Sequence, residues 1–339
     1  MSLLLSIASI LLFPCALLLD ILLGDPPNAW HPVCAAGSWA RRMEAFWKKH
    51  LGKTFLSGLL ATLCTFIPFL LLVGGSIAAT SLFLPGQAGK ILSWVIALLS
   101  IYFCIAPQGL ARHAQAVEQA AKEENLPQAR LAVSMIVGRD TQSLDMPGVL
   151  RATIESVAEN LTDGVLSTLF WAAIGTLLGG AFGCAVAVVL HRVANILDAL
   201  WGKKNEEYRR FGTFAARTDD ALNYLPARLS LPLIALASLF IRKTSTPKAF
   251  IMGWKYRYAH PSPNSAWSEA TFAGALDLQL SGPISYKGIL SPYPLIGEGR
   301  REAGINDLRL SIKLMWATSL LTTILCSLLS LLFALEKFL

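Results

Sequence analysis

Four ionisable side chains recur at helical spacing between Gly138 and Asp163. Arg151, Glu155 and Glu159 are four residues apart and Asp163 continues the row, so one face of a helix would carry all four. Carboxylates this close repel one another unless a cation lies between them. Mg²⁺ suits such a place, because proteins bind it through one or two carboxylates together with phosphate oxygens. The alternative is a solvated helix face with ordinary charge pairing.

The segment just before this row adds polar groups that favour a site. It reads G-R-D-T and supplies Arg139, Asp140 and Thr141, while Asn160 is one position from Glu159. Pro147 suits the first turn of the predicted helix.

A second group of polar side chains lies between residues 191 and 228. Asn195 and Asp198 are three residues apart on a predicted helix face. A second acidic cluster with flanking arginines consists of Arg217, Asp219, Asp220, Asn223 and Arg228. Two acidic clusters with interleaved basic residues fit a polyphosphate whose oxygens are shared between Mg²⁺ and guanidinium groups. The G-x-x-x-x-G-K-[ST] pattern is absent from the sequence, which excludes a P-loop.

Two proline-rich loops each present a histidine. The first, L-L-G-D-P-P-N-A-W-H-P-V, contains Asp25 and His31, and the second, H-P-S-P-N, contains His260, Ser262 and Asn264. Such loops are typical of turns and helix caps. Residue types alone favour a structural role for both histidines.

The composition is that of a membrane protein. The chain of 339 residues is 54% hydrophobic and 15% charged, with a mean hydropathy of +0.52, whereas globular proteins carry about 25% charged residues. A net charge of +7 is explained by basic cytoplasmic loops, and we expect no nucleic-acid partner. The six cysteines are scattered without a C-x-x-C pattern, so neither a zinc site nor a disulfide framework is indicated.

Four apolar runs approach the roughly 20 residues that cross a bilayer. These predicted spans are residues 3–19, 55–84, 91–105 and 310–335. Five basic residues between the first two spans mark that loop as cytoplasmic, and the connection at 85–90 then lies outside. Residues 107–309, which contain most of the polar clusters, would therefore face the cytoplasm.

Two further apolar runs are harder to place. Residues 165–190 have basic flanks on both sides, so we expect a re-entrant hairpin that turns at Gly179-Gly180 and keeps both flanks inside. Residues 229–241 are too few to cross alone and would be interfacial. The predicted fold class is all-α, a polytopic integral membrane protein forming one domain over residues 1–339. It would have about four transmembrane helices, re-entrant or interfacial helices, and a cytoplasmic helical catalytic region.

Taken in order, these motifs resemble the CobD/CbiB family of cobalamin biosynthesis, the membrane-bound adenosylcobinamide-phosphate synthases. The resemblance runs from Asp20 to about Arg300 and rests on L-L-G-D-P-P, H-P-V, G-R-D-T, R-A-T-I-E-S-V-A-E-N-L-T-D, N-I-L-D, G-K-K-N-E-E-Y, A-A-R-T-D-D, N-Y-L-P-A-R-L and S-P-N. The chain departs from the usual family pattern at Thr168, His191, Ile196 and Ala199. The hydroxyl groups lost at Ile196 and Ala199 would remove polar contacts, but the carboxylates and arginines are kept.

The resemblance implies an ATP- and Mg²⁺-dependent ligase of vitamin B12 biosynthesis. Such an enzyme joins adenosylcobyric acid to aminopropanol or its O-phosphate through an amide bond. The expected location is the inner (plasma) membrane, as a multi-pass protein with its active site facing the cytoplasm. Expected partners are the lipid bilayer and other late cobalamin-pathway membrane enzymes.

The resemblance also implies roles for individual residues, as hypotheses. The catalytic candidates are Asp25, His31, Asp140, Glu155, Glu159, Asn160, Asp198 and His260. The substrate-binding candidates are Arg139, Thr141, Arg151, Asn195, Lys204, Asn205, Arg217, Asn223, Arg228, Ser262 and Asn264. The candidate metal ligands are Glu155, Glu159, Asp163, Asp219 and Asp220. The arginines would clamp phosphates, and a histidine or a carboxylate would serve as the base for the attacking ammonium.

Two other functions stay open. One is a non-catalytic regulatory or sensor protein of the same superfamily, although sensors and transporters would place charges inside the spans or show an internal repeat. The other is a Mg²⁺-dependent membrane prenyl- or phosphatidyl-transferase. Its D-D-x-x-D or D-G-x-x-A-R pattern does not occur in this sequence.

Overall fold

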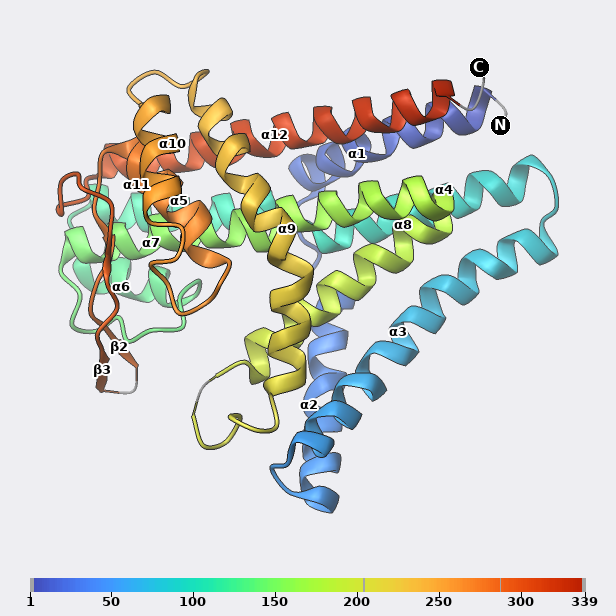
Figure 1. Ribbon diagram of the computed structural model, residues 1–339, viewed down its shortest axis with the longest axis horizontal. Coiled ribbons are helices and arrows are strands. Elements are labelled where there is room, and N and C mark those ends of the chain that lie inside the picture. The colour runs from blue at the N-terminus through green and yellow to red at the C-terminus, as the bar shows by residue number, and fades with distance from the viewer. Residues whose placement is uncertain (1–2, 204, 287, 337–339) are drawn as a thin grey trace. The chain divides into compact units, whose positions relative to one another are not determined.

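The computed structural model describes residues 3–203, 205–286 and 288–336, with side chains from residue 8 onward. Within them the chain is almost entirely helical, which confirms the predicted all-α class (Figure 1). The helices are α1 (Leu3–Leu23), α2 (Pro32–Leu51), α3 (Phe55–Phe83), α4 (Gln87–Cys104), α5 (Pro107–Lys122), α6 (Leu126–Ser134), α7 (Met146–Asn160), the π-helical segment η1 (Leu161–Leu166), α8 (Ser167–Trp201), α9 (Thr213–Ser238), α10 (Thr246–Lys255), α11 (Ser265–Leu276) and α12 (Ile305–Glu336). The short strands are β1 (Leu280–Ser281), β2 (Ile284–Tyr286), β3 (Ile289–Ser291) and β4 (Leu295–Ile296).

Four helical stretches of the described chain are long and apolar enough to cross a membrane, by length and composition. They are Phe55–Phe83, Gln87–Lys122, Met146–Trp201 and Ile305–Glu336. Three of them contain the predicted spans at 55–84, 91–105 and 310–335, apart from single terminal residues. The other contains the run at 165–190. The first predicted span, 3–19, falls in α1, whose apolar part Ala8–Leu23 is shorter than these four stretches. The chain is a multi-pass membrane protein on this basis.

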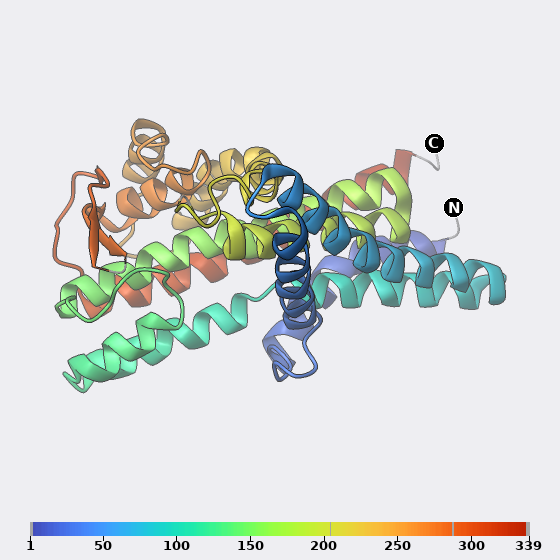
Figure 2. The same cartoon turned by 90° about the horizontal axis from the view of Figure 1, so that it is seen from below.

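The helix α8 folds back on itself at two glycines. Gly179 (φ −147°, ψ 20°) and Gly180 (φ 58°, ψ −140°) both leave helical geometry. A Cβ on Gly175 would lie 2.3 Å from the carbonyl oxygen of Gly183, and a Cβ on Gly183 would lie 2.2 Å from that of Gly175. Eight residues of continuous helix would separate these positions by about 12 Å. The chain therefore reverses here, as a hairpin requires, and Figure 1 shows the two arms of α8 meeting at the turn and diverging away from it (seen from below in Figure 2).

The chain forms two compact units. The first unit comprises Met1–Ala106, Ser167–Leu222 and Thr323–Leu339, and the second comprises Pro107–Leu166 and Asn223–Thr322. The helices α9 and α12 contribute residues to both units.

In the first unit, α2, α3 and α8 pack around the buried rings of Trp201 and Phe211. These rings meet edge to face with centroids 5.1 Å apart. Gly58 of α3 permits a close approach, because a Cβ there would lie 1.7 Å from the Phe211 carbonyl oxygen.

The second unit combines helices with two small antiparallel sheets. It contains α5, α6, α7, α10 and α11, the strand pair β1–β4 and the hairpin β2–β3. The helices α10 and α11 lie against each other (Figure 1). These strands were not predicted, because two- and three-residue strands are too short to show an alternating apolar pattern.

Candidate functional site

The central contact of the candidate site is a buried ion pair in the second unit. Arg139 Nη2 lies 2.5 Å from Oε2 of Glu155, and the two side chains are 17% and 4% exposed. Burial lowers the pKa of Arg139, but the adjacent Glu155 carboxylate outweighs this and raises it above its ordinary value. The other oxygen of Glu155, Oε1, accepts a hydrogen bond from the backbone N–H of Ser281 at 2.5 Å. Both oxygens of Glu155 are therefore engaged.

The loop after β1 is shaped to deliver that N–H group. Ser281 has φ 58° and Gly282 has φ 97°, both left-handed. Arg301 donates from Nη1 to the Ser281 carbonyl oxygen at 2.7 Å, and Arg151 donates from Nη1 to the Arg301 carbonyl oxygen at 3.1 Å. Burial and the neighbouring Arg151 lower the pKa of Arg301. Arg151 thus supports the loop against which Glu155 is held.

Asp140 fastens the G-R-D-T segment to the β2–β3 hairpin. Its Oδ2 accepts hydrogen bonds from Ser285 Oγ and from the Gly288 N–H, both at 2.7 Å. Its own N–H donates to the Ser285 carbonyl oxygen at 2.9 Å. The segment and the hairpin together form an open cavity of about 680 Å³, lined by Arg139, Asp140, Thr141, Gln142, Ser143, Ser285 and Gly288. Guanidinium and hydroxyl groups give this cavity the donors that bind phosphate oxygens.

A third carboxyl group, which the sequence analysis did not select, lies among the predicted ones. Glu269 on α11 is 4% exposed. Burial first, and then the charges of Glu159 and Glu155, raise the pKa of Glu269 well above its ordinary value despite the opposing effect of Arg139. Burial and the neighbouring carboxylates therefore favour the protonated form of Glu269. Its only signal in the sequence is a single carboxylate inside the otherwise uncharged stretch S-A-W-S-E-A-T-F.

The predicted metal ligands are only partly suited to that role. Both oxygens of Glu155 are engaged, whereas within the described residues Glu159 accepts one hydrogen bond, at Oε1 from Ser265 Oγ at 3.0 Å. Asp163 follows one turn later in η1. Asp219 and Asp220 belong to the first unit. Among the described residues, no three His, Cys, Asp or Glu side chains are grouped so as to hold a metal ion on their own.

The predicted residues at the start of α11 come together around Arg228. Arg228 Nη1 donates to Asn264 Oδ1 at 3.1 Å, and its guanidinium carbon lies 3.4 Å from the Tyr224 ring centroid. The Asn264 N–H donates to Ser262 Oγ at 3.3 Å, and the Ser262 N–H donates to His260 Nδ1 at 3.0 Å. Arg228 is thus positioned by both an amide and an aromatic face.

In the first unit, Asp25 and His31 also form a pair. His31 Nε2 lies 3.5 Å from Asp25 Oδ1, and His31 is 9% exposed. Its Nδ1 accepts from the Val33 N–H at 3.2 Å, which makes His31 the N-cap of α2. The ring is therefore held by contacts on both nitrogens.

Several other predicted residues have local structural contacts. Asn160 Nδ2 donates to the Ser156 carbonyl oxygen at 2.8 Å, and Asn205 Oδ1 accepts from the Tyr208 N–H at 3.1 Å. Thr141 and Asn223 are buried, Arg217 is exposed, and the Asp198 side chain fills the space beside Gly202. Lys204 lies outside the described residues.

The first unit also contains a network of charged side chains that was not predicted from the sequence. Lys48 Nζ lies 2.7 Å from Oε1 of both Glu44 and Glu207, and Lys53 also pairs with Glu207. These lysines lower the pKa of Glu207 to about 2. Burial and the hydrogen bond that Tyr208 donates to Glu44 raise the pKa of Tyr208 to about 12. The network ties the end of α2 to the loop that carries G-K-K-N-E-E-Y.

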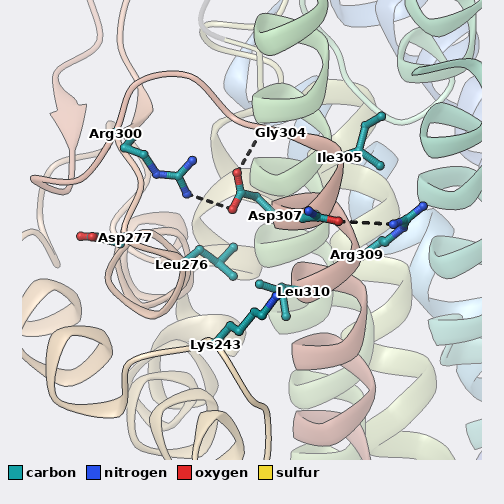
Figure 3. Close-up of a pocket in the computed structure, with 10 residues that line it drawn as sticks. Lys243, Leu276, Asp277, Arg300, Gly304, Ile305, Asp307, Arg309 and Leu310 are labelled. Atoms are coloured by element: carbon teal, nitrogen blue, oxygen red, sulfur yellow. Dashed lines mark hydrogen bonds and ion pairs between the residues drawn. The ribbon is translucent and has the colours of Figure 1, made fainter. Parts of the chain in front are cut away.

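Figure 3 shows a second cavity of the second unit, of about 670 Å³. Arg300 Nη2 lies 3.0 Å from Asp307 Oδ1, and Asp307 Oδ2 accepts from the Gly304 N–H at 2.8 Å. Arg309 pairs with Glu118 at 2.6 Å. Both arginines are thus paired with carboxylates, as Arg139 is with Glu155.

Comparisons with known proteins agree over most of the chain. A family model described as "CobD/Cbib protein" matches residues 13–315. A cobalamin biosynthesis protein CobD from Leptospira interrogans serogroup Icterohaemorrhagiae serovar copenhageni (strain Fiocruz L1-130) is 37% identical over 309 residues, which cover 91% of this chain and 94% of the relative.

Two more relatives show similar coverage. A cobalamin biosynthesis protein CobD from Clostridium perfringens (strain 13 / Type A) is 38% identical over 290 residues, 85% of this chain and 88% of the relative. A cobalamin biosynthesis protein CbiB from Salmonella arizonae is 37% identical over 315 residues, 92% and 95% respectively. No solved structure matches the chain.

Proposed function

Because the chain belongs to the CobD/CbiB family of cobalamin biosynthesis proteins, we propose that it is an adenosylcobinamide-phosphate synthase. In this proposal it joins adenosylcobyric acid to aminopropanol or aminopropanol O-phosphate, with ATP as co-substrate. The reaction takes place on the cytoplasmic side of the plasma membrane, where other late cobalamin-pathway membrane enzymes are the expected partners.

A carboxylate must be activated before an amine can attack it. In the simplest route, a carboxylate oxygen of the corrinoid attacks the γ-phosphorus of ATP, giving an acyl phosphate and ADP. The amine, having lost a proton to a base, then attacks the carbonyl carbon and releases phosphate as the amide bond forms. Both steps need charged oxygens to be held in place more than they need covalent help from the protein.

The observation that carries the proposal is the buried Arg139–Glu155 pair at the edge of the 680 Å³ cavity. Glu155 fixes the guanidinium of Arg139, whose other N–H groups have no partner among the described residues and can bind phosphate oxygens in a fork. Thr141, Ser143 and Ser285 add hydroxyl groups on the same cavity wall. A prepositioned donor of this kind stabilises a transferring phosphoryl group without reorganising.

The donor set of the second unit also fits Mg²⁺ held partly by substrate. Oε2 of Glu159 has no hydrogen-bond partner among the described residues, and Asp163 follows one turn later. One or two carboxylates with phosphate oxygens suffice for this ion. Bound Mg²⁺ would neutralise phosphate charge during transfer. Asp219 and Asp220 stay in the proposal as a second pair of carboxylates. Glu155 is better suited to holding Arg139.

The test is an assay of the purified protein in detergent with adenosylcobyric acid, aminopropanol phosphate, ATP and Mg²⁺. We expect cobinamide product, and we expect Arg139→Lys to lower kcat/KM by about 10² to 10³, the cost of losing one transition-state donor. Arg257→Lys is the matched control, because Arg257 is half-buried and stacks on Trp254 outside this cavity.

The proposed metal ligands can be tested by measuring metal binding directly, apart from ligase activity. Glu159→Gln and Asp219→Ala should weaken Mn²⁺ binding, measured by electron paramagnetic resonance with nucleotide present, whereas Glu298→Gln should not. Full ligase activity in folded Glu159→Gln would remove that residue from the proposal. If the parent chain makes no product where the Salmonella arizonae relative does, the regulatory function is favoured. Turnover of an isoprenoid diphosphate instead would favour the transferase.

A further inference from the structure

The first unit contains an apolar groove that the proposed reaction does not use. It has a volume of about 310 Å³ and is lined by side chains from α2, α3, α4 and α8, among them Val73, Leu99 and Val189. Along α4 the wall runs from Ile96 to Cys104, a helical length of about 12 Å. A groove of this size and length accommodates part of a hydrocarbon chain.

One cation, Arg192 of α8, lies in the wall of this groove. Its Nε is buried and has no hydrogen-bond partner. Its Nη1 makes one long hydrogen bond, 3.4 Å, to Asn195 Oδ1, and no described carboxylate pairs with it. An uncompensated charge in a membrane-type helix is costly, so a ligand that brings an anion to Arg192 would recover that free energy.

A second arginine lies close to the same groove. A Cβ built on Gly37 would be 3.8 Å from Nη1 of Arg41 and also 3.8 Å from Cγ2 of Ile196, a residue of the groove wall. The Arg41 side chain is exposed and donates only to Ser38 Oγ, at 3.2 Å. The apolar wall is thus accompanied by one half-buried guanidinium, whose Nε is buried, and one exposed guanidinium.

We propose that this groove binds an anionic phospholipid, with a segment of one acyl chain against the apolar wall and the phosphate beside Arg192. A soluble anion would leave the apolar wall uncovered, and a neutral lipid would leave Arg192 without a counter-charge. The groove is too small for a whole lipid, so the rest of the molecule stays in the bilayer. This inference does not depend on the ligase reaction.

The test offers the purified, delipidated full-length chain an equal mixture of phosphatidylglycerol and phosphatidylcholine with identical acyl chains. Native mass spectrometry then measures which lipid is retained. We expect a preference for phosphatidylglycerol of roughly fivefold, about the effect of one basic side chain at an anionic membrane surface. Arg192→Gln should abolish the preference and Arg192→Lys should keep most of it. Arg242→Gln, an exposed arginine outside the groove, is the control.

A second measurement locates the acyl chain without relying on any one variant. Phosphatidylglycerol with a photoreactive group in the chain should crosslink to groove residues such as Val73 and Phe103, and Ser76→Phe should suppress these crosslinks. Leu82→Phe, on an exposed part of the same helix, should not. Equal retention of both lipids, an unchanged preference in Arg192→Gln, crosslinks confined to residues outside the groove, or displacement of the lipid by inorganic phosphate would each overturn the proposal.

Discussion

His31 and His260, each followed by a proline, use their rings in the same way. In both, Nδ1 accepts from the N–H two residues later, at 3.2 and 3.0 Å. The proline between them has no N–H and a fixed φ, so the next donor along the chain turns toward the ring. This geometry occupies the lone pair of Nδ1, which a general base would need. It supports a capping role for the ring, alongside the catalytic one that the family resemblance implies.

The capping role predicts that His31→Asn will be tolerated, because an asparagine side chain also caps helix N-termini. We expect ligase activity within about tenfold of the parent, whereas losing a general base costs about 10² to 10⁴. His31→Ala should lower the free energy of unfolding by about 1 kcal/mol. The measurements are product formation and thermal unfolding of both variants. If folded His31→Asn lost more than 10²-fold in ligase activity, the result would support a general-base role for the His31 ring instead.

The Glu207 network predicts a pH-dependent contribution to stability. Because Lys48 and Lys53 lower the pKa of Glu207 to about 2 from 4.5, the folded state holds the charged form more strongly than the unfolded state. The stabilisation is therefore present above pH 4.5 and disappears as the pH falls toward 2. Glu207→Gln should unfold at a slightly lower temperature than the parent from pH 7 to 5, and the two curves should converge below pH 4.5.

Salt provides the control for that experiment. Glu207 is well exposed, so added salt should reduce the same difference at pH 7. A difference that grows on acidification would contradict the assignment.

At the scale of elements, the hairpin in α8 depends on two glycines that touch across its arms. Gly175→Ala would place a Cβ 2.3 Å from the Gly183 carbonyl oxygen, so the arms must separate. We expect a loss of about 1 to 3 kcal/mol, the usual cost of overpacking, read as a lower unfolding temperature in detergent. Gly75→Ala on α3 is the control, because its Cβ would meet nothing within 4 Å. Equal unfolding temperatures of the two variants would show that the two arms of α8 can separate without loss of stability.

The elements predicted correctly are those marked by a long pattern along the sequence, either a run of apolar residues or basic residues on both sides of a turn. Apolar length indicates α3, α4 and α12, and basic flanks on both sides of Gly179-Gly180 pointed to a reversal there. The π-helical segment η1 and the strands from β1 to β4 left no such pattern. Each depends on contacts with distant residues, as where Glu155 accepts the N–H of Ser281 from 126 residues away.

The residues of the candidate site likewise fall into those that the sequence pattern indicated and those that it did not. The G-R-D-T segment and the Glu155 row stood out because charge is rare in this chain, and the structure joins them through Arg139. The role of Arg151 and the presence of Glu269 could not be read from spacing. Arg151 reaches the backbone of Arg301, and Glu269 comes from a different helix.

At the scale of the whole molecule, membrane orientation is the open prediction. The loop charges place residue 90 outside and residue 205 in the cytoplasm. Single-cysteine variants Lys90→Cys and Asn205→Cys, made after replacing the six native cysteines, should react with a membrane-impermeant maleimide from opposite sides of sealed vesicles. Labelling of both from one side would refute the orientation, and a cysteine in place of the exposed Arg41 on α2 should be labelled from the same side as residue 205.

The reversal at Gly179-Gly180 has a consequence for the lipid beside it. The first arm of α8, Ser167 to Leu178, has a helical length of about 18 Å, while the hydrocarbon layer of a typical bilayer is about 30 Å thick. An arm that entered the bilayer at Ser167 would leave the non-helical peptide groups of Gly179 and Gly180 short of the opposite surface. Hydrocarbon does not hydrate such groups, so the bilayer would have to thin or admit water there. Membrane thickness then becomes a physical variable that acts directly on this fold.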